Sequence, residues 1–289
     1  MFDLHLHSTF SDGSDNVDIL IEKIKKAGVN YFSITDHDSA LSARTILSNK
    51  NLQNKIRENN LTYVTGTEWS CKFNGYSIHI LSYDFDPFLP EVLEFEKEIK
   101  AILREQTEQR LIKIAEMGYT FSKESMDYLK SQTNVKKPHL ANCLVRDGYF
   151  ETIQDAMNIC LSKIKLPKKF SLDAEKVIKT LSNCGAKMVW AHSIHGLGKK
   201  PISFEEIETL CVEMKKIGLT GLECYYSLYN KDEINKLIEI ANKLGLFITC
   251  GSDYHGENKV VKIAEISSDG SKVDEKNIKI KEIFKNVIE

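Results

Sequence analysis

Short apolar or alternating runs recur along the chain, and most are followed by a longer stretch with helical spacing. The runs that predict strands are Phe2–His7, Tyr31–Thr35, Leu61–Glu68, Gly75–Tyr83, Lys187–Ala191, Gly221–Cys224 and Leu246–Cys250. The stretches that predict helices are Val17–Lys26, Ala40–Glu58, Asp173–Asn183, Phe204–Lys216, Lys231–Lys243 and a closing helix over Asn277–Glu289. Repeated strand–helix units indicate a mainly parallel sheet, and this many units in one α/β chain favour a barrel.

The segment 87–169 interrupts this alternation. Two prolines introduce a long charged helix over roughly Glu91–Met117, and the shorter helices after it have no convincing strand between them. Long insertions on barrels usually extend from the loops of the active face. We therefore expect a barrel built from 1–86 and 170–289, with 87–169 as a helical insertion that covers the active site. The alternative is that this segment is one part of an irregular α/β domain.

The composition is that of a globular protein with a substantial core. Of the 289 residues, 42% are hydrophobic and 28% are charged, which is typical of folded domains. The net charge of −2 produces no overall field that would hold nucleic acid, so we expect no stable duplex binding. An anionic substrate must therefore meet a local basic cluster. No apolar run approaches the ~18 residues of a membrane-spanning helix, so no membrane association is expected.

The cysteines and the first residues indicate the cellular compartment. The seven cysteines are odd in number, widely spaced and free of any CxxC pair, which argues against a disulfide framework and a thiolate zinc site. Most of these cysteines are explained if they act as small apolar residues of the core. The opening MFDLHLHS has neither a basic region nor an apolar run, so we expect no secretory signal and a cytoplasmic location.

Histidines and carboxylates gather at or just after the predicted strands. His5 and His7 alternate on the first strand, so their side chains point to one face and can bind one ion. The other candidate ligands are Asp12, His37, Glu68, His79, His192, Asp253 and His255. Each alone has an ordinary structural explanation, but together they would leave several buried polar groups unpaired unless cations gather them. Imidazoles and carboxylates without thiolates suit two or three divalent ions of Mn, Fe or Zn.

The same residues resemble the motifs of a known family, the polymerase and histidinol phosphatase (PHP) family, in order and over nearly the whole chain. The motifs are the HxH pair His5 and His7, the ITDHD run around His37, the lone Glu68, the later His79 and His192, and the GSDYH run ending at His255. The resemblance implies a distorted (β/α)7 TIM-like barrel with a trinuclear metal centre. It implies the following ligand sets: His5, His7, Glu68 and Asp253 for one ion, Asp12, His37 and His255 for a second, and a bridging Glu68 with His79 and His192 for a third.

Three positions depart from the family pattern. Asp12 stands where many relatives have histidine, and a harder ligand shifts the metal preference toward Mn or Fe. Ser193 follows His192 where the family often has proline, which puts the shape of that loop in question. Lys137 stands where nucleotide-acting members carry arginine, so the charge is kept but the bidentate fork is lost.

Basic residues of the insertion supply the expected phosphate contacts. Lys137 and His139 flank Pro138 at a predicted helix start, and both lysine side chains and helix N-termini favour phosphate. Further candidates are Arg104 and Arg110 on the long helix, and Lys168 and Lys169 at the far boundary of the insertion. The alternative for all of these is a solvated basic face. His195 is expected either to contact the phosphate and protonate the leaving oxygen, or to be a loop residue.

We therefore expect a metal-dependent phosphoesterase with Glu68 and His195 as catalytic residues. A hydroxide that bridges the metals would attack phosphorus in line, while the ions and Lys137 neutralise its oxygens. The leading hypothesis is a nucleotide substrate: a 3′,5′-nucleotide bisphosphate, or a short oligonucleotide degraded 5′ to 3′. The alternatives are a phosphatase for a small metabolite such as histidinol phosphate, and a non-catalytic module stabilised by metal.

Overall fold

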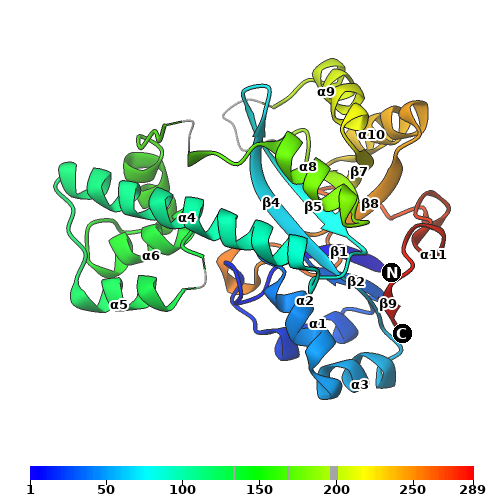
Figure 1. Ribbon diagram of the computed structural model, residues 1–289, viewed down its shortest axis with the longest axis horizontal. Coiled ribbons are helices and arrows are strands. Elements are labelled where there is room, and N and C mark those ends of the chain that lie inside the picture. The colour runs from blue at the N-terminus through cyan, green and yellow to red at the C-terminus, as the bar shows by residue number, and fades with distance from the viewer. Residues whose placement is uncertain (133, 168–169, 196–200) are drawn as a thin grey trace.

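The strands form two sheets in the computed structural model, which describes residues 1–132, 134–167, 170–195 and 201–289 (Figure 1). Within these residues, the first sheet contains, in order, β1 (Phe2–Leu6), β2 (Tyr31–Ile34), β3 (Thr62–Val64) and β9 (Val287–Ile288). The second contains, in order, β4 (Gly66–Phe73), β5 (Tyr76–Tyr83), β6 (Lys187–Ala191), β7 (Leu219–Tyr226) and β8 (Phe247–Gly251). The chain thus has the mixed α/β fold that its alternating pattern predicts.

The strand pairing of the described residues differs from the expected closed barrel of parallel strands. Parallel pairs join β1 to β2, β2 to β3, β6 to β7 and β7 to β8, but β5 is antiparallel to both β4 and β6. The two sheets approach one another at isolated bridges, Leu6 with Tyr254 and His37 with Glu68. A continuous ladder around the molecule is therefore absent from this part of the chain, and the two bridges lie at the end of β1 and just after β2.

A two-residue turn explains why β4 and β5 are antiparallel. Asn74 and Gly75 have φ angles of 46° and 87°, and Phe73 faces Tyr76 across the turn. An Asn-Gly pair between apolar runs is the strongest local signal for a hairpin, because both central residues of such a turn need positive φ. The hairpin was missed when 75–83 was assigned to a separate strand. It places Glu68 inside a long strand rather than at a strand end, and His79 lies inside its strand as expected.

The expected third strand, Leu61–Glu68, is divided between the two sheets. β3 ends at Val64, and β4 begins at Gly66 in the other sheet. A side chain at Gly66 would collide with the Ser33 hydroxyl of β2, so only glycine lets the chain pass this closely. The break brings Glu68 across from the end of β2, where its backbone N–H donates to the Thr35 carbonyl at 3.1 Å.

Two expected helices also differ from the structure. The helix over 40–58 is two helices, α2 (Leu41–Ser48) and α3 (Lys50–Glu58), because Asn49 is extended and its side chain caps α3 through the Asn51 N–H at 2.9 Å. The expected closing helix is replaced by the short elements η4 (Glu275–Asn277) and α11 (Ile280–Ile283), and then by β9, which pairs antiparallel with β3.

The remaining helices of the α/β portion match the expected positions closely. They are α1 (Val17–Lys26), α8 (Ala174–Asn183), α9 (Phe204–Lys216) and α10 (Lys231–Leu244). Each buries an apolar stripe, as Val17, Leu20, Ile21 and Ile24 of α1 do. In Figure 1 the helices α1 to α3 lie below the sheets, and α9 and α10 lie above them.

Helices also fill the segment between β5 and α8. They are α4 (Pro90–Glu116), α5 (Lys123–Ser131), α6 (Lys137–Arg146), α7 (Ile153–Asp155) and the π-helix η1 (Ala156–Leu161). The far end of α4 and the helices after it share a hydrophobic cluster of their own, which includes Ile114, Leu129, Leu140 and Leu161. Figure 1 shows α4 extending from the sheets to α5 and α6, which stand apart on the left.

The β4–β5 turn provides a test of the hairpin. Gly75 has no atom within 4 Å of where a Cβ would lie, so a substitution there adds backbone strain without a clash. We expect Gly75→Val to lower the free energy of unfolding by about 1–3 kcal/mol, because valine disfavours positive φ. Gly75→Asn should cost less, since asparagine tolerates this region. Urea denaturation of both variants measures the difference, and equal stability of the valine variant and the parent would contradict the turn.

Candidate metal centre

The site begins with His5 of β1 and with His7 just after it, both fully buried at the junction of the sheets. Because they are two residues apart on a strand, both rings leave the same face. The chain just after β8 runs close beside them: the Asp253 N–H donates to the His5 carbonyl at 2.8 Å, and the His7 N–H donates to the Tyr254 carbonyl at 2.9 Å. A side chain at Gly251 would collide with the Cβ of His5, so glycine is required for this approach.

The first ligand group consists of His5, His7, Glu68 and Asp253, all buried. Glu68 Oε2 lies 3.2 Å from His5 Nε2 and 3.2 Å from His7 Nε2. Asp253 Oδ1 lies 3.2 Å from His7 Nε2 and 3.6 Å from His5 Nε2. Two imidazole nitrogens and two carboxylate oxygens thus face a common point, which is an arrangement that can hold a divalent cation.

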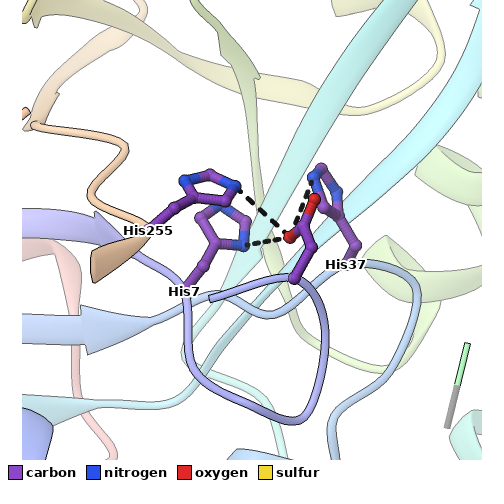
Figure 2. A group of neighbouring side chains, drawn as sticks. His7, His37 and His255 are labelled. Carbon is purple, nitrogen blue, oxygen red and sulfur yellow. Dashed lines mark ion pairs between the residues drawn. The ribbon is translucent and has the colours of Figure 1, made fainter. Parts of the chain in front are cut away.

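The second group forms around Asp12, in the loop after β1. Its Oδ1 lies 3.3 Å from His255 Nε2, and 3.9 Å from both His7 Nδ1 and His37 Nε2. Figure 2 shows the three histidines directed at this carboxylate. The structure adds His7 to the three residues expected here, because its two ring nitrogens face different groups.

The third group is built on the other oxygen of Glu68. Glu68 Oε1 lies 2.6 Å from His79 Nδ1 and 3.0 Å from His192 Nε2. His37 also contributes, since its Nδ1 lies 3.2 Å from Glu68 Oε2. Glu68 therefore stands between all of these histidines, with one oxygen directed at the first group and the other at the third.

Several of these ligand atoms are buried without a hydrogen-bond partner among the described residues. They are His5 Nε2, His7 Nε2, Asp12 Oδ1, His37 Nδ1 and Glu68 Oε2. They lie close together, yet their lone pairs converge instead of forming hydrogen bonds. Leaving buried polar atoms unsatisfied is costly, so native proteins rarely do so. The donor set of imidazoles and carboxylates fits divalent cations of the Mn, Fe or Zn type, and a cation at each group would satisfy these atoms.

Charges within the cluster compensate one another in the metal-free protein. Burial disfavours the ionised carboxyl of Glu68, but His79, His5 and His37 hold its pKa well below the usual value. Burial likewise disfavours a charged imidazole at His7, but Asp253 and Glu68 raise its pKa to about 9. A cation that binds here would therefore take the place of protons on the histidines.

Glu223 of β7 is a fully buried acid that sequence reasoning did not select. Its Oε1 lies 2.9 Å from His5 Nδ1, and its Oε2 accepts the His192 backbone N–H at 2.8 Å. When His5 donates from Nδ1, its Nε2 is left with the lone pair that faces the first group. The available signal was an acidic residue within the apolar run of 221–224.

Asp253 is oriented in a similar way by two donors. The Tyr226 hydroxyl donates to Asp253 Oδ2 at 3.0 Å, and Lys259 Nζ donates to the same oxygen at 2.7 Å. The other oxygen, Oδ1, is thereby directed at His5 and His7. Neither donor lies in one of the recognised motifs, so the sequence alone did not associate them with the site.

The chain just before α6 contacts the loop that follows β2. The side chain of Lys136 forms an ion pair with Asp38, and its Nζ lies 3.4 Å from the Ser70 hydroxyl. The Asn134 amide donates to the His37 carbonyl at 3.3 Å. Lys136 rather than Lys137 is therefore the lysine that contacts the ligand-bearing loop.

Comparison with known proteins places these residues in a family. Residues 3–186, more than half of the chain, match the model of the PHP domain. The chain belongs to the PHP domain family. It is 26% identical to a 5′-3′ exoribonuclease of Haemophilus influenzae over 88% of this chain and 89% of that protein. It is 22% identical to a 3′,5′-nucleoside bisphosphate phosphatase of Chromobacterium violaceum, over 88% of this chain and 86% of that protein.

A solved structure of similar fold agrees with the family assignment. A protein assigned as a metal-dependent phosphoesterase, from Bifidobacterium adolescentis, superposes with a TM-score of 0.77 at 25% identity over 93% of both chains. The predictions of the PHP family and of the phosphoesterase class of enzyme are thus confirmed.

The residues of this PHP protein that were expected to bind phosphate differ from one another in burial. Lys137 and Arg110 are half-buried, and burial followed by the nearby Arg110 charge lowers the pKa of Lys137. Arg104 is mostly exposed and pairs with Glu108 at 3.4 Å. The remaining candidates, Lys168 and Lys169, lie outside the described residues.

The two expected non-ligand histidines have different neighbours in the PHP domain. His139 of α6 is buried, and its Nδ1 accepts the Lys136 backbone N–H at 3.0 Å. His195 packs against Tyr229, with ring centroids 5.5 Å apart, and its Nε2 is buried without a hydrogen-bond partner among the described residues.

Among the helices of the described residues, none has the length and apolar composition of a membrane-spanning helix.

Removal of metal should destabilise this PHP domain, because the convergent lone pairs would lose the cations that satisfy them. We expect a chelator to lower the melting temperature of metal-loaded protein by about 5–10 °C, which corresponds to the stabilisation by a ligand at ~100 times its Kd. Thermal denaturation with and without added Mn²⁺ measures the shift. Glu68→Ala should reduce this shift in melting temperature. An unchanged melting temperature, with no metal found by elemental analysis, would contradict the site.

Proposed function

We propose that this PHP protein hydrolyses phosphomonoesters of nucleotides, as a 3′,5′-nucleoside bisphosphate phosphatase or a 5′-3′ exonuclease on short oligonucleotides. The observation that carries the proposal is the set of buried, unpartnered ligand atoms that converge in three neighbouring groups, two of which include Glu68. The names of the relatives, an exoribonuclease and a nucleoside bisphosphate phosphatase, support the choice of substrate class.

The ligand groups suggest three ion positions. The proposed sets are His5, His7, Glu68 and Asp253 for the first, Asp12, His37 and His255 for the second, and Glu68, His79 and His192 for the third, with His7 also close to the second and His37 to the third. Glu68 would bridge the first and third positions, because each of its oxygens faces a different group. Divalent ions bound here would lower the pKa of a water molecule and neutralise charge on the phosphate.

The side chains of the protein would orient the substrate and move its protons. Arg110 and Lys137 are half-buried neighbours, and among the described residues neither has a carboxylate within ion-pair distance. A phosphate group would supply the missing negative charge, so we assign them to phosphate binding. His195 has an unpartnered buried Nε2, and a proton held on that atom could pass to the leaving oxygen.

We also propose that the segment 87–169 covers the active site. Within this segment, the Asn134 amide donates to the His37 carbonyl, and Lys136 forms an ion pair with the neighbouring Asp38 carboxylate. These contacts attach the helical segment beside the second and third ligand groups. A substrate held there would be enclosed between the helices and the ends of β1 and β2.

Phosphate release tests the substrate class. We expect the Mn²⁺-loaded full-length protein to hydrolyse adenosine 3′,5′-bisphosphate with a kcat/KM at least about tenfold above that for histidinol phosphate, because only the nucleotide offers two phosphates for the metals and the Arg110–Lys137 pair. A reversed preference would support the small-metabolite alternative. Failure to hydrolyse either compound, or an oligonucleotide, would overturn the enzymatic proposal in favour of a non-catalytic module.

Two substitutions separate the metal centre from the phosphate contact. Glu68→Ala should abolish turnover and lower the bound metal, because it removes a ligand shared by two groups. Lys137→Ala should raise KM by about tenfold while the metal content stays unchanged, which corresponds to the loss of one charged contact. Lys123→Ala, at an exposed lysine of α5, is the matched control. Full activity and full metal content in Glu68→Ala would exclude the bridging role.

A further inference from the structure

A cavity of about 390 Å³ adjoins the candidate metal centre, with which it shares Asp12. One wall is the loop after β1 together with η3 (Gly256–Asn258), and it includes Asp12, Ser14 and Asn258. The opposite wall is formed by α5 and α6, and it includes Tyr128, Gln132 and Asn142. This volume lies within the range of small-molecule sites and is large enough for a nucleobase.

Asp12 belongs both to this cavity and to the second ligand group. Its Oδ1 is the atom that His7, His37 and His255 face, and the same residue lines the cavity. Asn258 fixes this wall, since its Nδ2 donates to the Asp12 carbonyl at 2.8 Å. A substrate whose phosphate is held at the ligand groups would therefore have its organic part beside the cavity.

The opposite wall presents an aromatic ring in a fixed position. The Tyr128 ring meets the His139 ring edge-on, with centroids 6.2 Å apart and planes at 73°. The Arg146 guanidinium lies 5.1 Å from the centroid of the same ring. Contacts from two sides hold the ring, and a held aromatic side chain is a surface on which bases of any sequence can stack.

The same wall offers amide groups with free hydrogen-bonding capacity. The Asn142 carboxamide makes no hydrogen bond to another described residue. Gln132 uses its Nε2 on the Tyr128 carbonyl at 3.2 Å and on the Ser131 hydroxyl at 3.1 Å, which leaves its Oε1 available. A carboxamide presents a donor and an acceptor side by side, which matches the edge of a base such as adenine.

We propose that this cavity holds the nucleobase of the substrate, with Tyr128 contacting the ring and Asn142 bonding to its edge. The inference rests on the proposed phosphoesterase function and extends it to base recognition. Asp12 then separates two parts of one binding site: phosphate on the side of the histidines, and base on the side of α5 and α6. Asn142 would determine specificity without touching the reacting atoms.

A comparison of substrates with and without a base tests the cavity separately from catalysis. We expect Asn142→Leu in the metal-loaded full-length protein to raise KM for adenosine 3′,5′-bisphosphate by about tenfold, equivalent to one lost hydrogen bond with a desolvated partner. Hydrolysis of p-nitrophenyl phosphate, which has no base, should change by less than about twofold. Asn51→Leu, at an exposed position of α3, is the matched control and should change neither.

The other possible results of these assays count against the base site or against the proposed function. Equal losses on both substrates, or an unchanged KM for the bisphosphate, would overturn the base site while leaving the phosphoesterase intact. If the parent protein hydrolyses neither substrate, the proposed function fails, and equilibrium dialysis with AMP and ribose 5-phosphate then decides the cavity. If Asn142→Leu binds AMP more weakly than the parent does but binds ribose 5-phosphate equally well, the base site is supported. Equal binding of AMP by the variant and the parent would refute it.

Discussion

Both oxygens of the Glu68 carboxylate are buried, and each faces different histidines: Oε2 lies 3.2 Å from His5 and His7, whereas Oε1 lies 3.0 Å from His192. A buried carboxylate is tolerated only when positive charge or hydrogen-bond donors surround it. Those partners come from β1, from β5 and from the loop after β6. The way in which the two sheets meet is therefore constrained by the need to bring these segments around one side chain.

That constraint is visible in the backbone where the ligands leave their strands. His192 and Asp253 have φ angles of 32° and 58°, and Asp38, next to His37, has 54°. Non-glycine residues in this region typically cost about 1–3 kcal/mol each and persist when the surroundings require them. Here the His192 N–H donates to Glu223, and the Asp253 N–H donates to the His5 carbonyl. The strain is thus concentrated at residues that direct ligands into the cluster.

The candidate ligands could be predicted from sequence because their pattern is visible in short stretches of the chain. Alternation on a strand directs His5 and His7 to one face, and histidines or acids follow successive apolar runs. The sheet topology was less accessible. The Asn74–Gly75 turn reverses the chain and converts an expected parallel strand into a hairpin partner, and Gly66 lets the chain cross to the other sheet. Both outcomes depend on close packing and turn geometry, which periodicity alone does not report.

The residues that orient the ligands were missed for a related reason: their roles depend on contacts between distant segments. Glu223 lies in an apolar strand 218 positions from His5, and Lys259 is one lysine in a polar loop. Lys136 and Lys137 are adjacent and chemically identical, and the family pattern selected Lys137 without indicating a role for Lys136. In the structure, Lys136 neutralises the buried Asp38, while Lys137 remains beside Arg110. The ion pair with Asp38 thus attaches the helical segment to the ligand loop, which agrees with our assignment of phosphate binding to Lys137 rather than Lys136.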